Sequence, residues 1–117
     1  MPVVKMPNVP VFAAIRDTDA AGRDVLVVTG DVDLATAHEL VAAADVLAGS
    51  AAGGPVRLDL GGVTFLDSTG VSALLEIRRA AAAAGNDVVV VDQSSAVDRV
   101  LALAGIADLF TPGSSDA

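Results

Sequence analysis

The order strand, helix, strand in the middle of this chain constrains its fold more than any other feature. An alternating apolar run at 56–60 is typical of a strand, and a helical pattern then extends to Ala84, before Gly85. Residues 88–91 are consecutive valines, which indicate a second strand. Two strands joined by a helix lie parallel in one sheet. We therefore predict an α/β fold and expect residues 88–91 to be buried on both faces of that sheet.

Turn-forming residues divide the N-terminal part of the chain. Residues 9–16 and 25–29 predict the two strands of a β-hairpin, and Gly30-Asp31 is expected to end the second strand. Gly61-Gly62 is expected to end the strand that begins at Val56. The prediction is a mixed β-sheet, in which an N-terminal hairpin is followed by parallel strands with βαβ crossovers, packed with helices.

End signals predict two more helices. Thr36 and Glu39 have the spacing of a capping box, and Gly49 is expected to end the helix that they begin. Ser95 is expected to cap the last helix, which ends at Gly105.

Length and composition exclude several classes of protein. The 117 residues suit one domain, expected at 9–111 with flexible termini at 1–8 and 112–117. The absence of cysteine excludes disulfides, thiolate metal sites and cysteine catalysis, and with a single histidine we expect no metal and no cofactor. A net charge of −8 disfavours nucleic acid and anionic membranes as partners. No apolar run approaches the ~20 residues that span a bilayer, and residues 1–8 do not form a signal peptide, so we expect a cytoplasmic protein.

The segment Asp67-Ser68-Thr69-Gly70 combines two hydroxyls, a carboxylate and a glycine where a helical pattern begins. A phosphate on Ser68 would lie at the positive end of the helix dipole, while Asp67 would repel it and could orient the free hydroxyl. Gly70 leaves room for a partner to approach closely. The segment predicts a phosphorylation switch, with Thr69 as the second candidate acceptor. The alternative is that Ser68 only caps the helix.

Helical geometry extends this site along one side of the helix. Ser68, Ser72, Leu75 and Arg79 fall within a stripe of about 60°, which indicates a partner-binding surface. Leu75 could instead lie at the edge of the core, and Arg79 could form an exposed pair with Glu76.

Three aspartates elsewhere are weaker candidates. Asp31 and Asp33 could belong to the same surface, because their strand should end near the strand that precedes Ser68; the alternative is ordinary helix-entry chemistry. The sequence does not indicate which group satisfies Asp59. One histidine, His38, expected to face solvent, cannot support a catalytic triad with Ser68, and no Gly-x-Ser-x-Gly or phosphate-binding loop is present, so an enzyme is not expected.

These motifs resemble, in order and spacing over residues 9–111, the STAS domain family, and in particular its bacterial anti-sigma factor antagonists. The signature D-S-[ST]-G is matched at 67–70, and a G-x-[LV]-D segment opening the first helix is matched at 30–37. The resemblance also covers a central strand at 58–60, a strand at 88–92, and a final helix and short terminal strand at 97–110.

The resemblance implies a STAS-type fold and a switch that works by binding. An unphosphorylated antagonist of this family binds an anti-sigma factor, often a GHKL-type serine kinase, and thereby releases a sigma factor for transcription. The kinase phosphorylates the acceptor serine, here Ser68, and a PP2C-type phosphatase restores it. A monomer or weak homodimer is expected. The alternatives are a stressosome-type scaffold and the STAS subunit of a lipid-transport ATPase complex.

Overall fold

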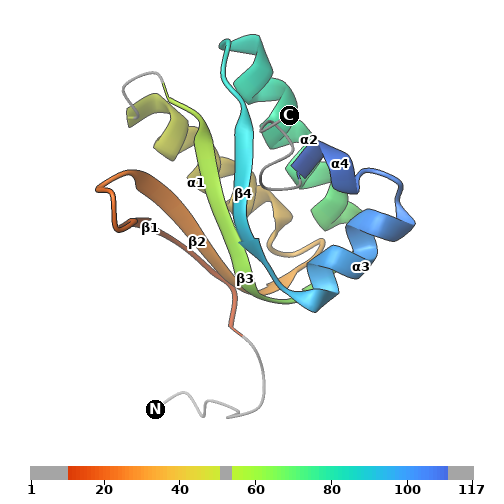
Figure 1. Cartoon of the computed structure of the whole chain (residues 1–117). Helices are drawn as coiled ribbons and strands as arrows, with labels where there is room; N and C mark the ends of the chain where they lie inside the picture. Colours follow the sequence, from red (N-terminus) through yellow and green to blue (C-terminus); the bar gives the residue numbers. More distant parts are fainter. Residues whose placement is uncertain (1–10, 51–53, 111–117) are drawn as a thin grey trace, which may run out of the picture.

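The computed structural model describes residues 11–50 and 54–110 and contains one four-stranded sheet with helices (Figure 1). The strands and helices, in chain order, are β1 (Ala13–Thr18), β2 (Asp24–Val32), α1 (Ala37–Ser50), β3 (Val56–Leu66), α2 (Ser68–Ala83), β4 (Val88–Gln93), α3 (Ser95–Leu103) and α4 (Ala107–Phe110).

The strand order is β1-β2-β3-β4. The hairpin strands β1 and β2 are antiparallel, whereas β2 with β3 and β3 with β4 are parallel. This arrangement confirms the predicted mixed sheet with an N-terminal hairpin and βαβ crossovers.

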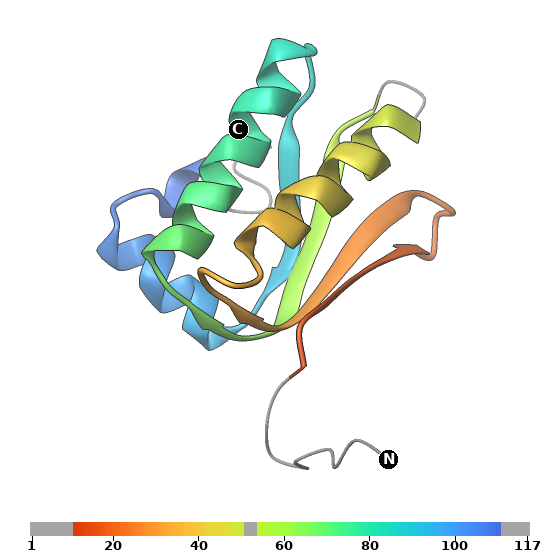
Figure 2. The same ribbon diagram turned by 180° about the vertical axis from the view of Figure 1, so that it is seen from behind.

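Helices α1 and α2 lie side by side over one face of the sheet (Figure 2), and α3 and α4 lie beyond β4 (Figure 1). Leucine, valine and alanine dominate the core, which includes Leu58 and Leu60 of β3 and Leu74 of α2. Phe110 of α4 is 1% exposed and belongs to the same core. Because all four helices contribute to one core, they leave the opposite face of the sheet without a helix in the described ranges.

Strand β4 corrects the prediction that residues 88–91 are buried on both faces. Val90 is fully buried, but Val91 is 45% exposed. The strand lies at the edge of the sheet, and helices cover only one of its faces. A run of valines therefore indicated a strand correctly but not its position within the sheet.

Glycines did not end the strands as expected. Strand β2 continues through Gly30-Asp31 to Val32, and β3 continues through Gly61-Gly62 to Leu66. These glycines instead lie where neighbouring groups come close. A β-carbon on Gly30, whose φ is +84°, would lie 2.5 Å from the Val11 carbonyl oxygen. One on Gly62 would lie 2.7 Å from the Thr29 methyl carbon.

Several predicted helix ends are also wrong. Gly49 lies within α1, and Ser94 rather than Ser95 caps α3. The Thr36 hydroxyl oxygen accepts a hydrogen bond from the Asp33 amide at 3.0 Å, and the Glu39 amide donates to the Thr36 backbone carbonyl, so the predicted capping box does not form. Residues 107–110 form a helix and not the expected terminal strand.

Some predictions lie outside the described residues, namely those for the termini at 1–8 and 112–117 and for the start of the first strand at 9–10. Among the helices in the described ranges, none combines the length and the apolar character needed to cross a membrane.

Candidate functional site

Asp67 is the single residue between the end of β3 and the start of α2. Asp67 has extended backbone angles and is the N-cap, and its carboxylate accepts a hydrogen bond from the Gly70 amide at 3.0 Å. The Thr69 hydroxyl donates to the same carboxylate oxygen at 2.5 Å. The Asp67 amide donates to the Val32 carbonyl oxygen at 3.3 Å, which holds the start of α2 against the end of β2.

Ser68 is the first residue of α2 and its side chain is exposed. The alternative that it only caps the helix is wrong, because Asp67 occupies the cap. In the described part of the chain its hydroxyl forms no hydrogen bond, whereas that of Thr69 is held by Asp67. The two candidate acceptors therefore differ in accessibility.

The Asp67 carboxyl is held in its ionised form. The hydrogen bond from the Thr69 hydroxyl is the main cause that lowers its pKa below the ordinary 3.8. Burial has the second-largest effect and raises the pKa, and the Gly70 amide lowers it by less. The start of α2 thus carries a fixed negative charge beside Ser68. Asp67 orients the Thr69 hydroxyl, and no hydrogen bond joins it to the Ser68 hydroxyl within the described residues, contrary to the expected orientation of Ser68.

Gly70 lies inside the fold and not at an open surface. It is buried, and a β-carbon there would lie 2.4 Å from Leu66 Cδ1 and 2.9 Å from the Val32 carbonyl oxygen. The predicted reason for this glycine, close approach by a partner, is therefore wrong. The glycine allows α2 to begin tightly against the ends of β2 and β3.

The predicted stripe along α2 is mostly exposed. Ser68, Ser72 and Arg79 are exposed, while Leu75 is partly buried against the core, as the alternative for that residue required. No ion pair joins Arg79 to Glu76 in the described ranges, so the suggested exposed pair is absent there.

A shallow groove of about 250 Å³ runs between α1 and α2 beside this stripe. Its walls include His38 and Val41 from α1 and Thr69, Ser72 and Glu76 from α2. His38 is exposed, as predicted. Sequence reasoning missed the groove, since no local pattern shows which faces of two helices meet. It also missed the bond between Asp67 and Thr69, which an N-cap aspartate followed by threonine at the second position could have indicated.

The end of β2 lies beside the end of β3, as predicted, because Val32 is paired with Leu66. Asp31 accepts a hydrogen bond from the Thr64 hydroxyl at 2.6 Å across these strands. Asp33 instead accepts from the Ala35 amide at 3.0 Å, which is the helix-entry role offered as its alternative.

Asp59 lies apart from this site, within β3 and on the face of the sheet that no described helix covers. Its carboxylate accepts a hydrogen bond from the Gly61 amide at 2.9 Å, which answers the open question about this residue.

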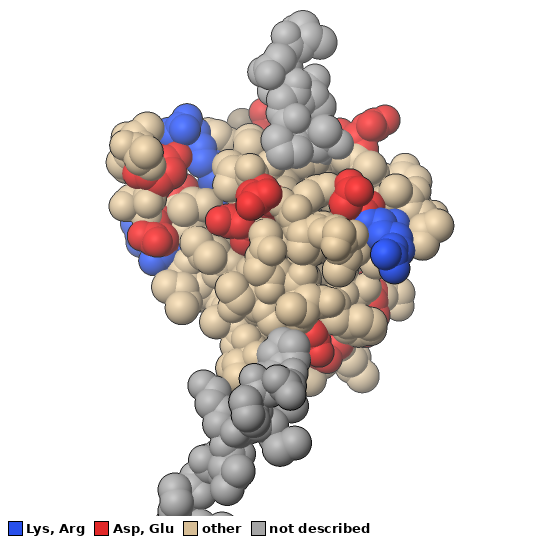
Figure 3. Space-filling view, turned by 60° about the horizontal axis from the view of Figure 1, so that its bottom comes forward, with Lys and Arg blue, Asp and Glu red and all other residues tan. Residues whose placement is uncertain are grey.

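The charges at this end of the molecule are mainly acidic. Figure 3, with this end turned forward, shows acidic side chains spread over a largely uncharged surface and basic ones toward the sides of the view. No three potential metal-ligating side chains gather in the described ranges. The site offers hydroxyls, a carboxylate and a groove, which suit contact with a protein.

Both the sequence and the fold of this chain match those of known proteins. A family model described as "Mlab, STAS domain" matches residues 15–111. No curated protein matches the chain. A solved structure of an anti-sigma factor antagonist from Mycobacterium paratuberculosis shares the fold, with a TM-score of 0.69 and 24% identity, over 93% of this chain and 89% of that one. The chain belongs to the STAS domain family.

Proposed function

We propose that this domain is an anti-sigma factor antagonist that is switched by phosphorylation of Ser68. The observation that carries the proposal is an exposed hydroxyl without a hydrogen bond in the described residues, at the first position of α2. Next to it, Asp67 and Thr69 are bonded to each other. The family match and the shared fold with an anti-sigma factor antagonist support this choice.

A phosphate on Ser68 would add charge to a site that is already negative. It would bring about −1.5 to −2 charges at neutral pH. The Gly70 amide is already occupied by Asp67, so the phosphate would add to this carboxylate and not replace it. A partner covering α2 would then have to desolvate both groups. A change of ~100-fold in affinity requires only about 2.7 kcal/mol, which one covered dianion can supply.

The proposed contact surface comprises the exposed stripe and the groove beside it. Ser68, Ser72 and Arg79 would contact the partner, with Leu75 at the margin of the core. Asp31, near the end of β2, and Asp33, just after it, would border the surface. Thr69 lines the groove. We expect the partner to be an anti-sigma factor, a GHKL-type serine kinase, with a PP2C-type phosphatase to reverse the reaction. The function is binding in the cytoplasm, not catalysis.

Incubation with ATP and a serine kinase that is recovered with the protein tests the proposal. Mass spectrometry should place one phosphate on Ser68. Ser68→Ala should abolish labelling yet keep binding, because a free hydroxyl contributes at most one modest hydrogen bond. Thr69→Ala is the matched control and should still be labelled. Labelling of Ser68→Ala at the wild-type rate would place the acceptor elsewhere.

Recovery of bound proteins separates this function from the two alternatives. A soluble kinase supports the antagonist, a very large assembly supports a stressosome-type scaffold, and a membrane ATPase supports a lipid-transport subunit.

A further inference from the structure

The face of the sheet opposite the helices carries exposed apolar side chains. Ile15 is 62% exposed and Val91 is 45% exposed. The strand pairing places Ile15 beside Val27, Val27 beside Asp59, and Arg57 beside Val89. These side chains, here named the open face, form one patch across all four strands, in which Val27, Arg57, Asp59 and Val89 are half-buried between the exposed Ile15 and Val91. Contiguous exposed apolar patches commonly mark protein–protein contacts.

Alternation along the strands shows that the open face is separate from the core. Leu26 and Val28 of β2 and Leu58 and Leu60 of β3 are buried beneath the helices. Successive side chains of a strand point to opposite faces, so Val27, Arg57 and Asp59 point away from that core.

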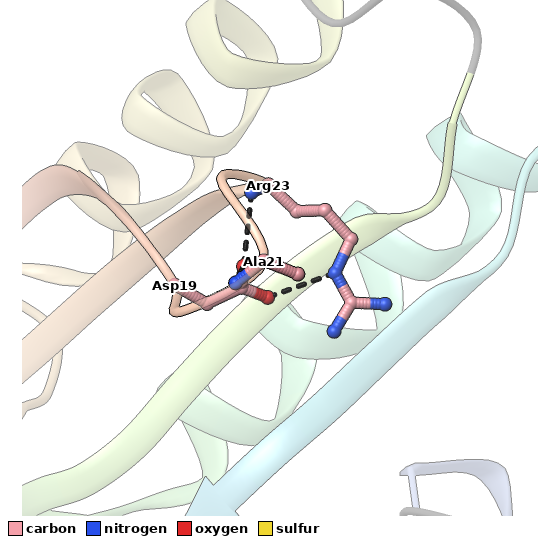
Figure 4. Close-up of polar contacts among 3 residues, drawn as sticks. All are labelled: Asp19, Ala21 and Arg23. Carbon is pink, nitrogen blue, oxygen red and sulfur yellow. Dashed lines mark hydrogen bonds and ion pairs between the residues drawn. The ribbon is translucent and has the colours of Figure 1, made fainter.

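The middle of the open face carries two opposite charges on one strand. Arg57 and Asp59 are two residues apart, about 7 Å along β3. Arg57 forms no ion pair among the described residues, and Asp59 accepts only the local bond from the Gly61 amide. Arg78, Arg79 and Arg99 form no ion pair within the described ranges either, whereas the two arginines of the hairpin are paired. Arg23 is paired with Asp19 within the hairpin turn at 2.9 Å (Figure 4), and Arg16 is paired with Asp24 at 2.8 Å.

The acidic end of the patch is reinforced by β4. Asp92 is paired with Asp59 across the two strands after a local irregularity at Val91. A β-carbon on Gly61 would lie 2.7 Å from the Asp92 carboxylate and 3.1 Å from that of Asp59. The carboxylates of Asp59 and Asp92 thus both lie beside Gly61. Arg57 lies two residues before Asp59 on β3.

This arrangement is complementary to itself. In a two-fold symmetric interface every contact occurs twice: if Arg57 of one copy contacts Asp59 of the other, then Asp59 of the first copy contacts Arg57 of the second. Two open faces stacked with antiparallel β3 strands would place Arg57 of each copy against the carboxylates of the other, with the apolar side chains around them. We propose that the open face binds a second copy of this chain and forms a symmetric dimer. The net charge of −8 opposes association, so the dimer is weak.

The dimer is independent of the proposed function. Helix α2 lies on the other face of the sheet, so Ser68 stays exposed in both copies (Figure 2). A dimer would therefore present two partner-binding surfaces on opposite sides.

Sedimentation equilibrium of the full chain up to about 1 mM tests this proposal by charge exchange. Arg57→Asp and Asp59→Arg should each weaken the dimer about 10-fold, since each replaces two exposed attractions with repulsions. The double variant Arg57→Asp/Asp59→Arg should restore most of the affinity, because the pairs form again with reversed signs. Asp45→Arg on α1 changes the net charge in the same way as Asp59→Arg, so it is the control for that variant and should not weaken the dimer.

Each of these results would overturn the proposal: no dimer at 1 mM, a dimer whose affinity is unchanged by the single exchanges, or a double variant that dimerises no better than either single variant. If the charge variants do not fold, Ile15→Gln serves instead, because its exposed side chain contributes little to the monomer and its loss should weaken the dimer. A chain lacking residues 1–10 that dimerises where the full chain does not would assign the open face to that segment, which also overturns the proposal.

Discussion

Helices α2 and α3 begin in the same way, yet only one beginning is a candidate switch. Each follows a parallel strand, each has a polar N-cap, and each has an exposed serine at its first position, Ser68 or Ser95. The α3 cap is the neutral Ser94, whose hydroxyl accepts from the Val97 amide at 3.2 Å. The α2 cap is an ionised carboxylate that also binds a threonine hydroxyl.

The surroundings of the two serines account for the difference. The start of α2 adjoins the end of β2 and the groove between α1 and α2, whereas α3 follows the edge strand β4. The third residue of α2 is Gly70, which packs closely against the backbone of Val32. The third residue of α3 is Val97, whose side chain lies in the core. An exposed serine at the start of a helix therefore does not by itself indicate a switch. The residues around Ser68 distinguish it from Ser95.

The largest expected effect comes from giving α2 the side chain that α3 has at this position. Gly70→Val should lower the free energy of unfolding by about 3 kcal/mol, because its β-carbon would meet the Val32 carbonyl oxygen at 2.9 Å. Gly49→Ala in α1 is the control: nothing lies within 4 Å of its β-carbon, so it should stabilise by about 0.5–1 kcal/mol. Urea unfolding measures both. Equal stability of Gly70→Val and wild type would contradict the close packing described for α2.

Removing each cap compares the two helix starts directly. Asp67→Ala should cost about 1–2 kcal/mol, because it leaves the Gly70 amide and the Thr69 hydroxyl without their acceptor. Ser94→Ala should cost about 1 kcal/mol, since one amide loses its acceptor. Thermal unfolding of the two variants measures the difference, and a larger loss for Ser94→Ala would reverse our ranking of the caps.

Adding a negative charge to each exposed serine sharpens the comparison in function. Ser68→Glu should weaken binding of the proposed anti-sigma factor partner about 10-fold, less than a phosphate would, because one carboxylate carries less charge. Ser95→Glu places the same charge at the start of α3 and should leave the affinity unchanged. Titration calorimetry distinguishes the two, and equal losses would remove the special role of Ser68.

The smallest effect is in the pH dependence of stability. The folded pKa of Asp67 lies below its ordinary 3.8, so its stabilising contribution is complete above that pH and is lost as the pH falls through the lower folded pKa. The stability difference between wild type and Asp67→Asn should therefore shrink below about pH 4. The effect of Ser94→Ala should not change with pH over this range, as serine does not titrate. Urea unfolding at pH 3 and pH 6 checks both.

Much of the fold could be predicted from local pattern. Apolar alternation at 56–60 and the valines at 88–91 located β3 and β4, and the helical pattern between them located α2. The start of α2 was also placed correctly, with Ser68 exposed on it, because capping residues act over one helical turn. The roles of particular glycines were not predictable, since Gly30, Gly62 and Gly70 are each required by atoms far away in the chain or on another strand.

The sequence by itself determined the order of strands and helices, the α/β class and the position of the switch candidate, because hydrophobic periodicity and helix caps are local properties. Only the tertiary structure decided that β4 lies at an edge and that the helices cover a single face, which leaves Arg57 and Asp59 on the uncovered one. Periodicity shows which side of one strand is apolar. It does not show which helix, if any, packs on that side, because this depends on segments that are distant in sequence.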